Sequence, residues 1–273
     1  MPSLKGFLNR KYLEYRLEQA PIVKAALVPG TDITVSFVVH TWFEHNNRAQ
    51  GSYVGEPDMV DWLKRELRDG DVFWDIGANV GAYSLLAAKL CPGARVFAFE
   101  PFIANFAHLW ENIVLNEVSA QVFPVNAGLL DHTAPEKLAV SDTRAGSSHH
   151  QVGEAGGKVQ QGVLCFRGGD VPKLLGLPVP TLLKLDIDGL EIRAIEGLRD
   201  VIANPTLRQA MVEIEKGKTE EPVQKIFEAE GFRRLPNPLT HATGGVFNAL
   251  FARDAQGAGS RVEKDRGNLK AET

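Results

Sequence analysis

Apolar runs and helical periodicity alternate through the middle of the chain. Each apolar run is followed by a segment in which apolar residues recur at every third or fourth position, the spacing of a helix with one buried face. The predicted strands are residues 72–76, 95–99, 121–125, 181–187, 209–215, 232–235 and 246–252. The predicted helices between them are residues 58–67, 82–90, 102–116, 190–202 and 220–230.

This alternation predicts an α/β fold with a doubly wound, mostly parallel sheet, covered by helices on both faces. The last two predicted strands, 232–235 and 246–252, form a hairpin-like pair. We therefore expect one antiparallel strand at the edge of a seven-stranded sheet. Ligands of such sheets bind at the carboxyl ends of the strands, where the strand order reverses.

The N-terminal part departs from this pattern. Residues 7–20 have the apolar spacing of a short amphipathic helix, which Pro21 ends, and residues 33–43 are β-branched and aromatic like a strand. We interpret residues 1–57 as an extension that covers the core like a lid. The core domain itself is expected at residues 58–253.

Two further stretches do not belong to the alternating core. Residues 131–170 are polar and glycine-rich, with strand-like alternation at 137–140 and 162–166, so we expect a β-hairpin insertion. Its tip at 142–157 is predicted to be mobile. Residues 254–273 are charged and nearly devoid of apolar side chains, which predicts a disordered tail.

A glycine-rich turn joins the first core strand to its helix. The turn has the pattern D-x-G-x-N-x-G, formed by Asp75, Gly77, Asn79 and Gly81. Glycines at a helix start let the backbone approach a nucleotide-like ligand closely. A dinucleotide fold prefers G-x-G-x-x-G, and a carboxylate at Asp75 would repel a pyrophosphate. The pattern suits S-adenosylmethionine, which has an ammonium and a sulfonium group but no phosphate.

The second core strand ends in Glu100, followed by Pro101. A carboxylate at this strand tip can accept hydrogen bonds from both hydroxyls of a ribose. The turn and the carboxylate together indicate an adenosine-containing cofactor. In the structural alternative, Gly77 and Gly81 only form a tight turn and Asp75 caps the helix. That alternative leaves Glu100 unexplained.

Charged residues interrupt the fourth core strand. The segment LLKLDIDGLE at 182–191 places Lys184, Asp186 and Asp188 on one side of an extended strand, with Glu191 in the first turn of the next helix. Such charges are costly to bury unless they are paired or functional. Asp186 could deprotonate or orient a substrate hydroxyl, with Lys184 tuning it or holding an anionic group. Alternatively, Lys184 only pairs with Asp186, and Asp188 or Glu191 caps the helix. 

Glu213 and Glu215 end the fifth strand on the same edge of the sheet and are secondary candidates.

Three segments resemble FkbM-type methyltransferases, which have the Rossmann-like class I S-adenosylmethionine-dependent fold. They are GDVFWDIGANVGAYS at 70–84, VFAFEP at 96–101 and LLKLDIDGLEIRAIEGL at 182–198. The resemblance extends over about residues 58–252. It implies methyl transfer to oxygen, commonly to a hydroxyl of a sugar, glycan or secondary metabolite. This chain has Asp188 where the family commonly has Glu, which keeps the charge but shortens its reach.

The resemblance also implies roles for individual residues. Those around the methionine part of the cofactor would be Asp75, Gly77, Asn79 and Gly81. Glu100 would hold the ribose, Pro101 and Phe102 would flank the adenine, and Asn126 would contact it. Two alternatives stay open: an NAD-type oxidoreductase, which the glycine spacing disfavours, and a non-catalytic nucleotide-binding module. An N-methyltransferase is weaker still, because no Asn/Asp-Pro-Pro-Tyr loop follows the fourth strand.

Composition narrows the partners. A net charge of −4 gives no reason to propose nucleic-acid binding. No apolar run is long enough to span a bilayer, and the N-terminus lacks the apolar segment of a secretory signal, so we expect a cytoplasmic protein without membrane partners. The two cysteines form no CxxC pair and are expected to be buried thiols. The expected partner is a small-molecule or carbohydrate acceptor, and the strand around Trp42 could pair with a second copy in a homodimer.

No spacing in the sequence defines a metal site. Histidines 40, 45, 149, 150 and 241 could each serve as a base, or bind a divalent ion together with Asp186 and Asp188. Solvated loop histidines are the simpler interpretation. A divalent cofactor ion therefore stays an open alternative, with no ligand set predicted.

Overall fold

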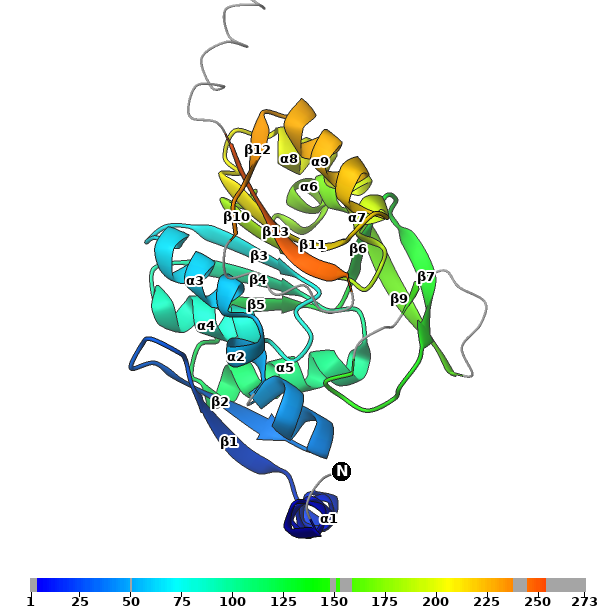
Figure 1. Ribbon diagram of the computed structural model, residues 1–273. Helices are drawn as coiled ribbons and strands as arrows, with labels where there is room; N and C mark the ends of the chain where they lie inside the picture. Colours follow the sequence, from blue (N-terminus) through cyan, green and yellow to red (C-terminus); the bar gives the residue numbers. More distant parts are fainter. Residues whose placement is uncertain (1–3, 50, 148–150, 153–158, 238–244, 254–273) are drawn as a thin grey trace, which may run out of the picture.

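The computed structural model describes residues 4–49, 51–147, 151–152, 159–237 and 245–253 (Figure 1). Its centre is a seven-stranded sheet in the order β12-β13-β11-β10-β3-β4-β5. The strands are β3 (Val72–Ile76), β4 (Arg95–Phe99), β5 (Val122–Val125), β10 (Leu182–Leu185), β11 (Gln209–Glu215), β12 (Phe232–Leu235) and β13 (Val246–Arg253). The predicted α/β fold with a mostly parallel seven-stranded sheet is confirmed.

The antiparallel strand is not at the edge, and that part of the prediction is wrong. β13 lies between β11 and β12 and runs antiparallel to both. After β11, the chain passes through α9 (Glu220–Ala229) and forms β12, which does not pair with β11 but leaves room for one strand between them. β13 fills the gap between them, so β12 becomes the edge strand.

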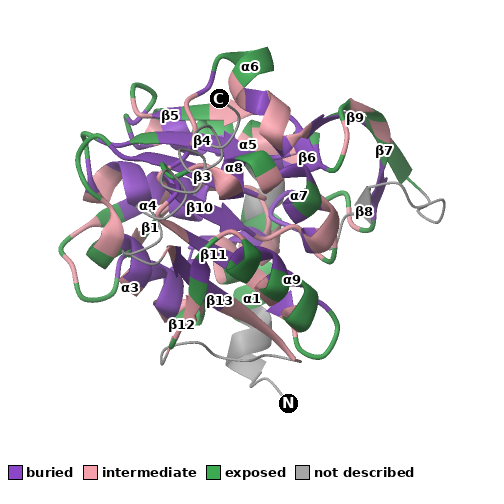
Figure 2. Ribbon diagram, turned by 90° about the horizontal axis from the view of Figure 1, so that it is seen from above, coloured by how far each residue is buried: buried purple, intermediate pink, exposed green. Residues whose placement is uncertain are grey.

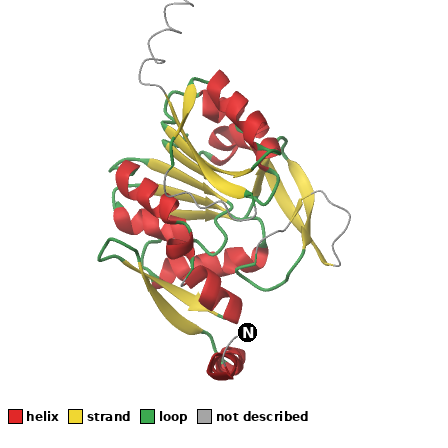
Figure 3. Cartoon of the chain, viewed as in Figure 1, coloured by secondary structure: helices red, strands yellow, loops and turns green. Residues whose placement is uncertain are grey.

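Helices cover both faces of the sheet (Figure 3). One layer contains α3 (Pro57–Glu66), α4 (Ala82–Leu90) and α5 (Ile103–Leu115). The other contains α6 (Val171–Leu175), α7 (Glu191–Gly197), α8 (Arg199–Ala203) and α9. In β3, Phe73 packs into the first core and Trp74 into the second, and all five residues are buried. Figure 2 shows the central strands buried between the two layers.

The helix predicted at 190–202 is split into α7 and α8. The break falls at Leu198, directly after Gly197. A Cβ added at Gly197 would lie only 1.7 Å from the carbonyl oxygen of Leu130. The end of α7 therefore contacts the backbone of β6 (Gly128–Leu130) at a position where only glycine fits.

The N-terminal extension contains α1 (Leu4–Gln19), a hairpin of β1 (Ile22–Leu27) and β2 (Thr34–Val39), the π-helix η1 (Glu44–Ala49) and α2 (Ser52–Gly55). Only the second hairpin strand was predicted, because β1 has no fully buried position. β2 buries alternate side chains, Val35, Phe37 and Val39, in the first core. The hairpin is therefore part of the core packing, while α1 lies beyond it (Figure 1).

The insertion after β5 forms a second sheet that projects from the core (Figure 1). It contains β6 (Gly128–Leu130), β7 (Ala134–Val140), β8 (Gln151–Val152) and β9 (Val159–Arg167), in the order β6-β9-β7-β8. The antiparallel pair of β7 and β9 is the predicted hairpin. Much of the tip predicted to be mobile lies outside the described residues, as does the tail at 254–273.

Two features concern the environment of the chain. Among the described residues, no helix combines the length and apolarity needed to cross a membrane. Cys91 and Cys165 are both buried free thiols, as expected.

Asparagine side chains of α5 satisfy the open edge of β2. Asn112 accepts the N–H of Val38 at 2.8 Å and donates to the carbonyl of Val80 at 2.9 Å. Asn116 accepts the N–H of Ser36 and donates back to its carbonyl. An unpaired strand edge is thereby closed by side chains.

We expect Asn112→Ala to destabilise the protein by about 2–3 kcal/mol, because the buried carbonyl of Val80 and the partly buried N–H of Val38 would lose their partner. Urea unfolding followed by circular dichroism measures this. Gln224→Ala, at a partly exposed position of α9 where the side chain donates to the exposed Glu228, is the control and should change stability by less than about 0.5 kcal/mol. Equal, small effects of both variants would contradict the role of Asn112.

Candidate active site

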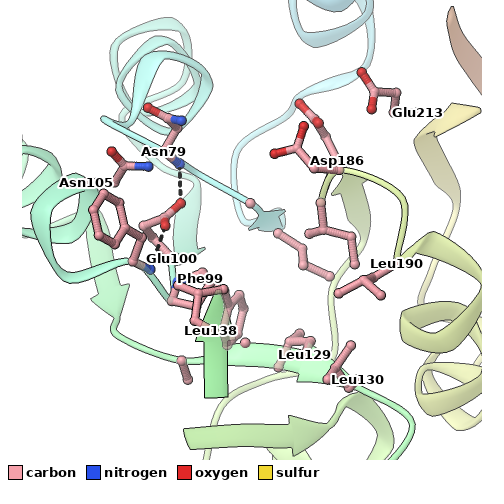
Figure 4. A pocket seen from close by; sticks show the side chains of 18 of the residues that line it. Asn79, Phe99, Glu100, Asn105, Leu129, Leu130, Leu138, Asp186, Leu190 and Glu213 are labelled. Atoms are coloured by element: carbon pink, nitrogen blue, oxygen red, sulfur yellow. Dashed lines mark hydrogen bonds between the residues drawn. The ribbon is translucent and has the colours of Figure 1, made fainter. Parts of the chain in front are cut away.

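A pocket of about 270 Å³ opens at the carboxyl ends of β3, β4 and β10 (Figure 4). Its lining combines an apolar side, a buried carboxylate and an acidic side, formed by Arg48, Glu56, Ile76, Gly77, Asn79, Phe99, Glu100, Pro101, Phe102, Asn105, Ala127, Gly128, Leu129, Leu130, Leu138, Ser147, Asp186, Ile187, Asp188, Leu190 and Glu213. A second cavity of about 740 Å³ shares Arg48, Glu56, Asp188 and Glu213 with it. We call these the inner pocket and the outer cavity.

Gly77 lies where three strand ends meet. Its φ is +80°, and an added Cβ would lie 1.8 Å from the carbonyl oxygen of Asp186. The N–H groups of Gly77 and Ala78 both donate to the carbonyl of Phe99 at 3.0 Å. The turn is therefore held between the ends of β4 and β10, in a conformation that requires glycine.

Asn79 and Gly81 shape the rest of the turn. Asn79 has a φ of +52°, and its side chain donates to the carbonyl of Ser147 at 3.0 Å. Gly81 precedes α4 with a φ of +91°, and an added Cβ would lie 2.5 Å from Leu109. Asn79 lines the inner pocket, whereas Gly81 is not among the described lining residues and allows close helix packing.

Glu100 is almost fully buried at the tip of β4. Its two carboxylate oxygens accept the backbone N–H groups of Asn79 and Phe102, each at 2.8 Å (Figure 4). Burial raises the pKa of Glu100 to about 7, although these hydrogen bonds and the charge of Arg48 favour the ionised form. Each oxygen keeps a lone pair for a further donor.

The apolar side of the inner pocket begins beside Glu100. Pro101 and Phe102 line it, together with Leu129 and Leu138 from the insertion sheet. Asn126 is not a lining residue in the described structure. Its side chain donates to the carbonyls of Glu100 and Pro101, so it supports the turn behind the pocket.

Two buried charges, those of Lys184 and Asp75, lie below the turn. The ammonium of Lys184 is 3.1 Å from Asp186, 3.5 Å from Asp75 and 3.4 Å from the carbonyl of Gly77. Burial disfavours this ammonium, but the charges of Asp186, Asp75 and Glu56 outweigh burial and hold the pKa of Lys184 above its usual range. Lys184 is thus a permanent cation. Asp75 also accepts the hydroxyl of Ser84 at 2.6 Å, and neither Asp75 nor Lys184 is among the lining residues.

Asp186 does reach the inner pocket. Its side chain is about one-third exposed, and Figure 4 shows it on the same side of the pocket as Glu213. The pairing with Lys184 that the sequence suggested as an alternative is present. It places one carboxylate oxygen on the cation and turns the group toward the pocket.

The charged residues do not form one row along an extended strand, and that prediction is wrong. β10 ends at Leu185, and Asp188 has a φ of +56°, so the chain turns before Asp188. Asp188 lines both cavities. Glu191 is buried, and its side chain accepts the N–H groups of Ile187 and Gly189, which holds this loop. Burial also raises the pKa of Glu191.

The structure brings further residues to the site that the sequence prediction missed. Arg48 and Glu56 come from the extension and line both cavities. Burial and the neighbouring charge of Asp186 raise the pKa of Glu56. Asn105 bonds the backbone of Gly146 and Ser147, which closes the loop over the pocket. No local motif marks these residues, although a π-helix like the one containing Arg48 often occurs at functional sites.

Glu213, a secondary candidate from the sequence, has a raised pKa. Burial, followed by the charges of Asp186, Glu191 and Asp188, raises the pKa of Glu213 to about 9. The acid is therefore protonated near neutral pH. A protonated carboxyl group can donate a hydrogen bond as well as accept one.

The two candidate histidines that the structure describes, His40 and His45, do not join Asp186 and Asp188. His40 lies 2.9 Å from Glu111, and His45 stacks on Trp42. Neither lines the inner pocket or the outer cavity as described. The other three, at 149, 150 and 241, lie outside the described residues.

Sequence comparisons place the chain among known methyltransferases. The profile of the methyltransferase FkbM domain matches residues 75–241. Hexuronic acid methyltransferase AglP of Haloferax volcanii is 28% identical over 210 residues, covering 76% of this chain and 80% of that protein. The 31-O-demethyl-FK506 methyltransferase FkbM of Streptomyces tacrolimicus is 29% identical over 177 residues, covering 55% and 67%. The structure of Methyltransferase FkbM from Methylobacillus flagellatus KT aligns with a TM-score of 0.49 at 15% identity, covering 68% of this chain and 44% of that one.

Glu213 should make the stability of the ligand-free protein depend on pH. Since its folded pKa of about 9 exceeds its ordinary value of 4.5, the folded state binds more protons within this window. The stabilising contribution is complete below about pH 4.5 and is lost as the pH rises through 9. We expect Glu213→Gln, which mimics the protonated acid, to melt higher than the wild type at pH 8 and equally at pH 4.5.

Thermal melts across this pH range measure the effect. The control is Glu215→Gln, on the same strand but 44% exposed and paired with Lys218, which should keep the wild-type pH dependence. If Glu213→Gln also follows the wild-type curve, Glu213 does not hold its proton in the folded state.

Proposed function

Since the chain belongs to the FkbM methyltransferase family, we propose that it transfers a methyl group from S-adenosylmethionine to a hydroxyl oxygen of a sugar or a similarly hydroxylated metabolite. Glu100 is the observation on which the proposal chiefly rests. It is a buried carboxylate at the strand tip, held by two backbone N–H groups, with lone pairs left for two ribose hydroxyls. An NAD-type oxidoreductase has no support from the family match.

The residues of the inner pocket fit this cofactor. Gly77 leaves no room for a Cβ where the backbone must come close. Pro101, Phe102 and Leu129 offer an apolar surface for an adenine ring, and Asp186 offers negative charge at the far side. Asp75 does not line the pocket, but it pairs with Lys184, which also holds Asp186. Gly81 and Asn126 support the turns that hold the lining residues.

Asp186 is our candidate proton acceptor. S-adenosylmethionine, when bound, supplies a methyl group already activated by a sulfonium, so the protein must align the acceptor oxygen and take up its proton. Asp186 lines the inner pocket and is held at 3.1 Å by Lys184. Lys184 stays protonated and acts as a positioning residue. Asp188 would contact the acceptor, and Glu191 would hold the loop between them.

The outer cavity favours a neutral acceptor. Its lining includes six carboxyl groups and two cationic side chains: Glu56, Asp58, Asp188, Glu191, Glu213, Glu215, Arg48 and Lys218. Those carboxyl groups that are ionised accept hydrogen bonds from sugar hydroxyls and repel an anionic group, while the protonated Glu213 can also donate. A hydroxyl is therefore a better acceptor here than a carboxylate. A divalent ion beside Asp186 and Asp188 is a further alternative, which full activity in excess chelator would exclude.

We expect Glu100→Ala to weaken the binding of S-adenosylhomocysteine at least about tenfold, which corresponds to about 1.4 kcal/mol. Two hydrogen bonds to the ribose would be lost. Because ribose hydroxyls donate to the ionised form, wild-type affinity should also fall as the pH drops below about 7, the pKa of Glu100. Calorimetric titration measures both effects, with Glu215→Ala as a control that should bind normally. Unchanged affinity in Glu100→Ala would refute the ribose role.

The stability of the methylated product in alkali distinguishes a hydroxyl acceptor from a carboxylate acceptor. Labelled methyl groups transferred to a panel of sugars and uronic acids should survive mild alkali, because methyl ethers resist it and methyl esters are hydrolysed.

We expect Asp186→Asn to lower kcat by about 10²-fold or more while cofactor affinity changes little. A base-labile product, or unchanged kcat in Asp186→Asn, would contradict the proposed acceptor or the proposed base.

A further inference from the structure

Two histidines and two glutamates meet where the extension joins the core. His40 directly follows β2, and Glu44 begins η1. His108 and Glu111 lie one turn apart on α5 and therefore project from the same face of that helix. None of the four lines the inner pocket or the outer cavity as described. The mechanism proposed above makes no use of this cluster.

The four side chains form a connected group. His40 Nε2 lies 2.9 Å from Glu111 Oε2, and His108 Nδ1 lies 2.5 Å from Glu44 Oε1. The two imidazole rings stack with 4.1 Å between their centroids. One donor atom each from His40, His108 and Glu111 can be chosen so that all three lie within 4.8 Å of one another.

Glu44 fixes the orientation of His108 through a hydrogen bond to its Nδ1. Its side chain is only 3% exposed. Its Oε2 accepts the backbone N–H of His40 and of Thr41, together with the hydroxyl of Thr41, and this leaves Oε1 for His108. One oxygen of this carboxylate accepts those three hydrogen bonds, and the other oxygen can accept a hydrogen bond from the imidazole N–H. In the tautomer that donates Nδ1–H to Glu44, His108 presents the lone pair of Nε2 to a metal ion.

This arrangement is the one found around metal-binding histidines. A ligating histidine usually donates its other ring N–H to a carboxylate, which fixes the tautomer and makes the ligand nitrogen more basic. Two imidazoles and one carboxylate suit a borderline ion such as Zn²⁺ rather than Mg²⁺ or Ca²⁺, which prefer oxygen ligands. We propose that His40, His108 and Glu111 bind Zn²⁺ or a similar transition-metal ion, with Glu44 as the supporting carboxylate.

The geometry allows the site to close on an ion. Tetrahedral Zn²⁺ with bonds near 2.1 Å keeps its ligand atoms about 3.4 Å apart. Donors up to 4.8 Å apart must approach by at most about 1.4 Å, and the 2.9 Å between His40 Nε2 and Glu111 Oε2 must widen by about 0.5 Å. The side chains of His40 and Glu111 are 32% and 44% exposed, so they can rotate, and an ion can enter from solvent. Water would complete the coordination shell.

The ion would link two parts of the chain. His40 belongs to the extension and the other two ligands belong to α5, so binding would join the hairpin to the core. The same contact steadies η1, whose Arg48 lines both cavities. Since the ion binds a site formed only in the folded protein, it should raise the melting temperature.

The test is calorimetric titration of tag-free, chelator-treated full-length protein with ZnCl₂, together with thermal melts. We expect one ion per chain and a higher melting temperature with Zn²⁺ than with chelator. His40→Ala and His108→Ala should each weaken binding at least about tenfold and remove the thermal shift. Glu111→Gln, a smaller change, should weaken binding without preventing folding.

The control is His132→Ala. His132 is also a surface histidine flanked by two carboxylates, Asp131 and Glu136, yet it belongs to no three-ligand group in the described structure. This variant should bind Zn²⁺ like the wild type. Equal binding by His40→Ala and the wild type, or loss of the ion only when His149 and His150 are both replaced, would overturn the proposal. These readouts are independent of methyl transfer.

Discussion

The buried ammonium of Lys184 is the contact on which the rest of the site depends. It lies among Asp75, Asp186 and the carbonyl of Gly77, and so joins β3, the glycine turn and the end of β10. Removing one partner of such a group leaves an uncompensated buried charge, which typically costs about 3–5 kcal/mol. The cation therefore determines which way the carboxylate of Asp186 points, and through the carbonyl of Gly77 it supports the turn that faces the pocket.

One lysine does not neutralise all the acids around it. Glu56, Glu191 and Glu213 all have raised pKa values, with burial the largest cause in each. The site thus concentrates negative charge and retains protons, an arrangement that local stability alone does not favour. Clusters of this kind typically mark functional sites, because the opposing charge or hydrogen bonds that relieve them come from a ligand.

How far the sequence predicts the structure depends on what each segment buries. β3, β4 and β11 were predicted to the residue because central parallel strands are apolar on both faces. β1 was missed since every one of its positions is at least partly exposed. The glycine turn and Glu100 were predicted from spacing, which local backbone geometry determines. Asp188 was misplaced because spacing along an ideal strand cannot reveal the left-handed residue that turns the chain.

The residues that spacing could not predict at all come from the extension. Arg48 and Glu56 line both cavities, yet they are separated in sequence from every motif of the core. They reach the site because Glu44 holds the π-helix between His40 and α5, and the hydroxyl of Tyr53 holds α2 on the carbonyl of Ala82 in α4. The extension thus supplies part of the wall that an acceptor would meet. Changes there can alter acceptor choice without touching the turn, Glu100 or Lys184.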